Sequence, residues 1–258
     1  MRPAFAVAAA LILLGSAPAW ADFHVESPDE IDLGEIEIEH NADASFDART
    51  RLGGAQSYTI EVGTGLTSWW HSEIEVGFDR EPGFNESTLL TQLVTENTFQ
   101  ITEPGEYFAD LAFYVEYGQT LTRGRNAGAN EVTFGPLIQK DIGRTTHTVN
   151  LFLTRELGPD QDTHGYDFSF AWQSRWNLWA PLSPAVEIYA DTGVIGQSPS
   201  FANQQWRAGP VAVGVLNFHQ LGLGNAGQFK YELGWLVGLT PGTPEGTLRW
   251  RLEMEIPF

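Results

Sequence analysis

The sequence of 258 residues contains no cysteine. This absence excludes disulfide bonds, metal sites built on thiolates and cysteine nucleophiles. Basic residues are also scarce, since 14 lysines and arginines face 33 aspartates and glutamates and give a formal net charge of −19. Because nucleic-acid binding needs a basic surface that contacts phosphates, this charge argues against a DNA or RNA partner. Beyond the first 21 residues there is no apolar run of the roughly 20 residues that a transmembrane helix requires.

The first 21 residues have the pattern of an export signal. Arg2 is followed by the apolar stretch FAVAAALILLG, and Ala19, Trp20 and Ala21 form an A-x-A cleavage pattern. We therefore expect residues 1–21 to be a cleaved signal peptide. No linker or change in composition divides residues 22–258, which we expect to form one domain. Loss of Arg2 would leave 13 basic against 33 acidic residues, a net charge of about −20.

Apolar and polar residues alternate along most of the mature chain, a pattern that indicates strands with one apolar face. In SYTIEVGTGL, for example, Ile60 and Val62 share one face while Glu61 and Gly63 share the other. Aromatic residues and glycine are abundant, which also favours β-structure with frequent turns. The runs of this kind span residues 31–40, 57–66, 70–79, 89–101, 107–117, 131–140, 145–156, 165–179, 185–193, 205–216, 228–239 and 247–258.

The lengths of these runs and of their connections predict a membrane barrel. Most runs match the 9–11 residues of a tilted membrane-spanning strand, and short connections alternate with longer polar ones. Two connections depart from this alternation, because 217–227 is long for a periplasmic turn and 240–246 is brief for an outer loop. Tryptophan and tyrosine lie near the ends of runs, as in aromatic girdles at the two membrane interfaces. They include Trp69, Trp70, Tyr107, Tyr117, Trp176, Trp179 and Trp206.

The sequence thus predicts an all-β fold, a single transmembrane antiparallel up-and-down β-barrel of about 12 strands with both termini in the periplasm. Closure into a barrel would pair the last strand with the first and leave no open edge. We expect this barrel in the outer membrane of a Gram-negative bacterium, surrounded by outer-membrane lipid. A soluble β-sandwich is the alternative fold, since it would show the same alternation.

The final ten residues, RWRLEMEIPF, resemble the C-terminal signal of Gram-negative outer-membrane proteins. That signal ends in phenylalanine and has alternating apolar residues upstream. The positions that match it are Trp250, Leu252, Met254, Ile256 and Phe258. The resemblance implies recognition by the barrel-assembly machinery. Pro257 departs from the pattern, because proline cannot donate a hydrogen bond to a strand ladder.

Longer segments resemble a group of uncharacterised proteobacterial outer-membrane barrels. These segments are GLTSWWHSEIEVGF, FGPLIQKDIG with THTVNLFLTRELG, and KYELGWLVGLTPGTPEGTLRWRLEMEIPF. They are similar to the porin-like family named for the meta-pathway of phenol degradation. The matching motifs are structural rather than catalytic, so the resemblance implies a fold and supports a substrate only weakly.

Charged residues of many runs fall on the face opposite the apolar one, which is the interior of a membrane barrel. The side chains expected to line this lumen are Glu61, Glu73, Glu75, Glu96, Asp110, Glu116, Asp167, Arg175, Glu187, Asp191, Arg207, Lys230, Glu232, Arg249, Arg251, Glu253 and Glu255. One interpretation is a lumen filled by cross-strand ion pairs. The other is a polar pathway with excess carboxylate, which would favour cations.

Catalytic and metal-binding motifs are weak. The histidines form no ligand-spaced pair such as H-E-x-x-H. A lipid-facing Ser–His pair of an outer-membrane lipase is not supported, because Ser72 and His71 are adjacent in a strand and face opposite sides. In DQDTHG, Asp160 and Asp162 could hold Ca²⁺, but a solvated turn explains them better. We therefore expect no catalytic residues, no cofactor and no resident metal.

The sequence favours a passive porin-like channel for small solutes, with cationic and aromatic solutes as the classes to test. Transport would be diffusion filtered by width and lumen charge, so we do not expect an enzyme. The first alternative is a plugged structural or adhesive barrel that transports nothing. The second is a lipid-modifying outer-membrane enzyme.

Overall fold

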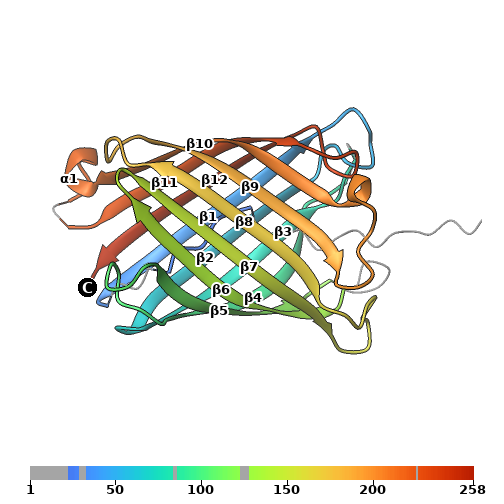
Figure 1. Ribbon diagram of the computed structural model, residues 1–258, viewed down its shortest axis with the longest axis horizontal. Coiled ribbons are helices and arrows are strands. Elements are labelled where there is room, and N and C mark those ends of the chain that lie inside the picture. The colour runs from blue at the N-terminus through green and yellow to red at the C-terminus, as the bar shows by residue number, and fades with distance from the viewer. Residues whose placement is uncertain (1–22, 29–32, 84–85, 123–127, 225) are drawn as a thin grey trace, which may run out of the picture.

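The computed structural model describes residues 23–28, 33–83, 86–122, 128–224 and 226–258. The predicted signal peptide, residues 1–21, lies outside the described residues. Twelve strands make up almost all of the regular structure, and they close into one antiparallel barrel in which β1 pairs with both β2 and β12 (Figure 1). Within the described part of the chain, no helix is long and apolar enough to cross a membrane.

Consecutive strands are neighbours throughout, so the barrel has the up-and-down topology that the sequence predicts. The strands are β1 (Glu35–Phe46), β2 (Gln56–Thr67), β3 (Trp70–Arg80), β4 (Leu89–Gln100), β5 (Asp110–Thr120), β6 (Asn130–Ile142), β7 (Thr145–Leu157), β8 (Asp167–Trp176), β9 (Ser183–Val194), β10 (Gln205–Asn217), β11 (Gln228–Gly238) and β12 (Gly246–Pro257).

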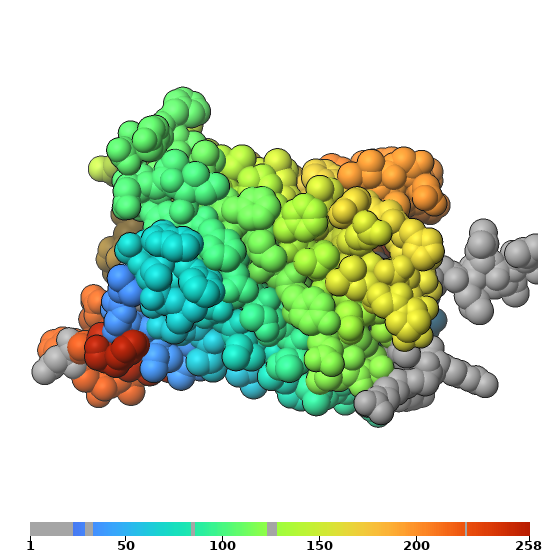
Figure 2. Space-filling view, turned by 90° about the horizontal axis from the view of Figure 1, so that it is seen from below, coloured from blue at the N-terminus to red at the C-terminus, as the bar shows by residue number. Residues whose placement is uncertain are grey.

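The alternation in the sequence becomes an inside and an outside. On β2, Ile60 and Val62 are 52% and 50% exposed, while Glu61 between them is 2% exposed. The same inversion recurs on most of the other strands, so apolar side chains cover the outside, while the interior is mostly polar with a few small apolar clusters. A soluble sandwich would bury its apolar face. This arrangement therefore excludes it and is that of a membrane barrel. Figure 2 shows one side of the resulting wall of side chains.

The first strand differs from its prediction. The sequence suggested residues 31–40, whereas β1 spans Glu35–Phe46. Its second half was missed because the outward positions are the small residues Ala42 and Ala44. Without large apolar side chains, these positions gave no alternating signal. Ala42 is nevertheless covered, because it lies opposite both Tyr58 and Trp250 in the ladders.

The two irregular connections lie at opposite ends of the barrel. The β10–β11 connection contains a short helix, α1 (Phe218–Leu221), which lies at the same end as the C-terminus (Figure 1). Gly222 ends α1 with a φ of 72°, a conformation that favours glycine. The β11–β12 connection lies at the other end and is held to the β1–β2 loop by hydrogen bonds from Arg49 to the carbonyls of Pro241 and Thr243.

The seam between the first and last strands is complete to its end. Glu35 lies opposite Pro257, and the Phe258 N–H donates to the Gly34 carbonyl at 2.8 Å. Pro257 is therefore accommodated at the very end of β12, where its missing N–H interrupts no interior ladder bond.

Candidate functional site: the barrel lumen

The lumen has one wall in which charges are paired. Arg249 donates to Glu187 Oε2 at 2.7 Å and also pairs with Glu232, and its side chain is 1% exposed. Arg251 pairs with Glu39 on β1. Lys230 pairs with Glu253 at 2.8 Å and with Glu255. Strands β9, β11 and β12, with Glu39 of β1, thus hold a network of largely buried ion pairs.

A glycine allows the contact between Arg249 and Glu187, which spans more strands than the other ion pairs. Glu187 and Arg249 come from β9 and β12, which are separated by two strands. A Cβ atom at Gly234 on β11 would lie 3.2 Å from Arg249 Cγ, so the arginine side chain lies directly above this glycine. The guanidinium therefore reaches Glu187 by passing over a position that carries no side chain.

The opposite wall, on β1–β5, is rich in carboxylates and poor in basic residues. Strands β1, β2, β4 and β5 contain no lysine or arginine, and β3 has only Arg80 at its end. Around the barrel, successive register partners on this wall are Glu255, Glu37, Gly63, Glu73, Glu96 and Glu116. A parallel row is Glu253, Glu39, Glu61 and Glu75, of which Glu253 and Glu39 are paired with Lys230 and Arg251. Like charges directly opposite one another destabilise a sheet, so stability alone does not account for these rows.

Neutral donors hold the acidic wall in place. Tyr114 donates to Glu96 at 2.7 Å, and Gln92 donates to Glu75 at 3.1 Å. Glu61 Oε1 accepts from Thr59 at 2.6 Å and from Asn41 Nδ2 at 2.9 Å. Such hydrogen bonds orient the carboxylates without cancelling their charge.

A segment before β1 lies inside the barrel, which the sequence reasoning did not anticipate. Val25 packs against Ala171, Tyr189 and Leu236 from three different strands. The Phe23 ring meets Tyr189 edge-on at 5.5 Å, and the Arg207 guanidinium lies 3.9 Å from the Phe23 ring centre. The only sequence signal for this placement was the pair of apolar residues in an otherwise polar stretch.

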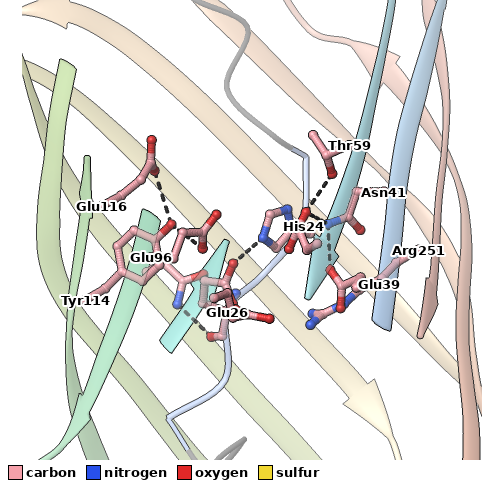
Figure 3. Close-up of polar contacts among 12 residues, drawn as sticks. His24, Glu26, Glu39, Asn41, Thr59, Glu96, Tyr114, Glu116 and Arg251 are labelled. Atoms are coloured by element: carbon pink, nitrogen blue, oxygen red, sulfur yellow. Dashed lines mark hydrogen bonds and ion pairs between the residues drawn. The ribbon is translucent and has the colours of Figure 1, made fainter. Parts of the chain in front are cut away.

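The polar residues of this segment are bound to the lumen wall. The Glu26 N–H donates to Asn150 Oδ1 at 2.8 Å, and Asn150 Nδ2 donates back to the Glu26 carbonyl at 2.9 Å. Ser27 Oγ donates to Gln139 Oε1 at 3.2 Å. His24 pairs with Glu26 within the segment, close to Thr59 and Asn41 (Figure 3). We name residues 23–28 the lumen segment; its contacts with strands from β6 to β11 narrow the interior.

The remaining residues expected in the lumen lie near the strand ends. Asp110 accepts from the Gly105 N–H in the β4–β5 turn, and Asp191 accepts from the Gly193 N–H. Arg175 donates to Asn177 at the end of β8. Arg207 donates to Gln205 on its own strand in addition to its contact with Phe23. Asp167 is the first residue of β8 and lies opposite Val194.

The residues expected to form the assembly signal face outward. Leu252, Met254 and Ile256 are between one third and two fifths exposed, and Phe258 is 81% exposed. The Trp250 ring contacts Tyr58 edge-on, with 6.3 Å between the ring centres. Among the described residues, Asp160 and Asp162 belong to none of the groups of side chains whose ligand atoms converge.

The closed antiparallel barrel, with an apolar outside and a charged interior, defines a transmembrane β-barrel of the outer-membrane type. The fold is similar to that of an outer membrane channel from Pseudomonas putida F1, with a TM-score of 0.61 and 12% identity over 89% of this chain and 97% of that chain. It is also similar to the NanC porin, with a TM-score of 0.52 and 9% identity over 86% of this chain and 100% of that chain. Neither a protein-family model nor a curated protein matches the sequence.

Proposed function

We propose that this protein is a passive porin-like channel for small solutes in the Gram-negative outer membrane and that it prefers cations. The observation that carries the proposal is the unequal lumen. The lysine and arginines of β11 and β12 are engaged in ion pairs, while β2–β5 present carboxylates such as Glu75 and Glu96 that accept hydrogen bonds from neutral donors. A pathway along such a wall attracts cations and repels anions.

The transport mechanism is diffusion, with no catalytic step. Side-chain layers and the lumen segment restrict the width, so the channel admits only small solutes. Ser72 and His71 do not form a catalytic pair, because Ser72 Oγ donates to the Glu96 carbonyl while His71 lies beside Glu37. The proposed role is therefore non-enzymatic, and its natural surroundings are outer-membrane lipid.

We also propose that the protein belongs to a porin-like family and that the barrel-assembly machinery recognises its C-terminal residues. The segments that resemble the porin-like family of the meta-pathway of phenol degradation support membership, and aromatic solutes would then be among those to test. The outward row from Trp250 to Phe258 supports recognition by the barrel-assembly machinery. Substitution of Phe258 by serine, followed by measurement of the amount of folded barrel, tests this recognition.

Ion selectivity in planar bilayers tests the channel. The double variant Glu73→Gln/Glu96→Gln removes two charges from one row, and we expect the reversal potential in a salt gradient to shift toward that of a non-selective pore. The control is Glu103→Gln, an exposed carboxylate in the β4–β5 turn, which we expect to leave selectivity unchanged. A wild-type barrel that does not conduct, or a double variant with wild-type selectivity, would overturn the proposal.

A second function is favoured by the lumen segment itself. With residues 23–28 packed inside and ion pairs on one wall, the barrel could be a plugged structural or adhesive protein whose outer loops bind a partner. In that case the same Glu73→Gln/Glu96→Gln substitution would change stability while conductance stayed absent. The bilayer experiment therefore separates the two functions.

A further inference from the structure

A histidine and two glutamates converge on the acidic wall near the end of the barrel at which β12 and the chain end. His71 and Glu73 are two residues apart on the inner face of β3, and Glu37 reaches them from β1 across Gly63 of β2. His71 Nε2 lies 3.3 Å from Glu37 Oε2 and 3.7 Å from Glu73 Oε1. His71 and Glu37 are more than nine-tenths buried.

These distances fit ligands around a metal ion better than they fit direct bonding. A charge-assisted N–H···O bond between an imidazolium and a carboxylate is about 2.7–2.9 Å long, shorter than both distances. Zinc binds imidazole nitrogen and carboxylate oxygen at about 2.0–2.2 Å, so neighbouring ligand atoms in a tetrahedron lie about 3.3–3.5 Å apart. The Glu37–His71 distance lies in this range, and the His71–Glu73 distance exceeds it by a few tenths of an ångström.

Gly63 supplies the space in which the ligand atoms meet. A Cβ atom at this position would lie 2.6 Å from His71 Nε2 and 2.7 Å from Glu73 Oε1. Gly63 is inside a strand and has no positive φ, so backbone conformation does not require glycine here. Glycine within a strand often marks a place where another group approaches closely, and here those groups are the two ligand atoms.

We propose that Glu37, His71 and Glu73 bind a divalent transition-metal ion of the Zn²⁺ class inside the lumen. One nitrogen and two carboxylate oxygens balance the charge of the ion, and a water molecule would complete a tetrahedron. The imidazole selects against Ca²⁺ and Mg²⁺, which take oxygen ligands. Glu253 and Glu255 lie on the other side of Glu37 and are engaged by Lys230.

The site is independent of conduction and is tested on the folded protein in detergent. After equilibrium dialysis against Zn²⁺, metal analysis should find one Zn²⁺ per chain that excess Ca²⁺ does not displace. Co²⁺ in its place should give the intense visible bands of a tetrahedral N/O site. We expect His71→Ala and Glu73→Gln to weaken Zn²⁺ binding by at least about 10- to 100-fold, the range found when even an outer-shell partner is lost.

Two further kinds of variant make the test specific. Gly63→Ala keeps every ligand but places a methyl group where the ligand atoms meet, and it should also lose the metal. His164→Ala, in the β7–β8 loop, and Glu116→Gln, further along the same row of carboxylates, should bind Zn²⁺ as the wild type does. The heat-dependent shift in gel mobility shows that each variant is a folded barrel. If His71→Ala does not fold, Zn²⁺ binding by the Glu73→Gln and Gly63→Ala variants tests the proposal.

The proposal is overturned if the wild type takes up no Zn²⁺, or if folded Gly63→Ala and Glu73→Gln variants retain it. A barrel that binds Zn²⁺ but does not conduct would support this site and overturn the proposed channel. A barrel that conducts without binding Zn²⁺ would do the reverse. The two proposals therefore fail separately.

Discussion

At the scale of single residues, inward-facing glycines arrange the lumen as much as charged residues do. Arg249 lies above Gly234, His71 and Glu73 lie above Gly63, and a Cβ at Gly77 would fall 2.5 Å from the Gln92 side chain. In each case a long polar side chain occupies the space above a neighbouring strand. Glycine at these positions leaves the space through which a long side chain of the neighbouring strand extends.

Arg249 is the residue on which we expect stability to depend most. Its replacement by methionine, which has similar length, leaves Glu187 and Glu232 buried without their cation. Removal of one partner from a buried pair costs about 3–5 kcal/mol, so we expect the free energy of unfolding of Arg249→Met in lipid bilayers to fall by about that amount.

The control for this prediction is Arg51→Met in the exposed β1–β2 loop, where a surface substitution changes stability by about 0.5 kcal/mol or less. The triple variant Arg249→Met/Glu187→Gln/Glu232→Gln should recover part of the loss, because it removes the uncompensated charges. A loss for Arg249→Met no larger than that of the control would contradict the prediction.

At the scale of elements, the β1–β2 and β11–β12 loops are joined by a charged clasp outside the membrane. Asp47 accepts from Arg49 and from the Glu245 N–H at 3.0 Å, and Arg49 donates to the Pro241 and Thr243 carbonyls. The hydrogen bonds from the Arg49 side chain hold the pKa of Asp47 well below its ordinary value. The clasp fixes two loops at the end of the barrel opposite the C-terminus, next to the β1–β12 seam.

The depressed pKa of Asp47 gives the clasp a defined pH dependence. Its stabilisation is fully present above the ordinary aspartate pKa of about 3.9 and is lost as the pH falls through the lower folded-state value. Asp47→Asn should therefore melt at a lower temperature than the wild type at neutral pH, and the difference should shrink in acid. Asp160→Asn, in the β7–β8 loop, serves as the control. A difference between Asp47→Asn and the wild type that stays constant with pH would refute this assignment.

The lumen segment is the element whose displacement should change conductance. Phe23 and Val25 hold it by apolar contact, and burial of such side chains contributes about 1.5–3 kcal/mol each when complete. We expect Phe23→Ala/Val25→Ala to raise single-channel conductance in planar bilayers. Leu223→Ala truncates an exposed apolar side chain in the β10–β11 connection and should leave conductance as it was. Unchanged conductance in the double variant would mean that the segment does not narrow the pathway.

At the scale of the whole molecule, alternation in the sequence was enough to predict the closed barrel, its class and most of its strands. It was not enough for β1 beyond His40, because small outward residues such as Ala42 hide the pattern. Nor could it pair the lumen charges, since Arg249 and Glu187 meet across two intervening strands rather than in one ladder. The lumen segment escaped prediction for a related reason: its partners, among them Asn150 and Tyr189, come together only when the barrel closes.

The β1–β12 seam also constrains the order in which the barrel folds. Its two strands are separated in the sequence by the ten others, so the contact that closes the barrel is among the most distant along the chain. Contacts of long sequence separation form slowly because a large loop must be closed first. The barrel cannot close before β12 is present. The lumen segment, which precedes β1, therefore either lies on the inner face of the curved sheet before closure or enters the barrel after it. Until that moment the unfinished chain exposes two open edges and depends on its surroundings to keep other strands from adding to them.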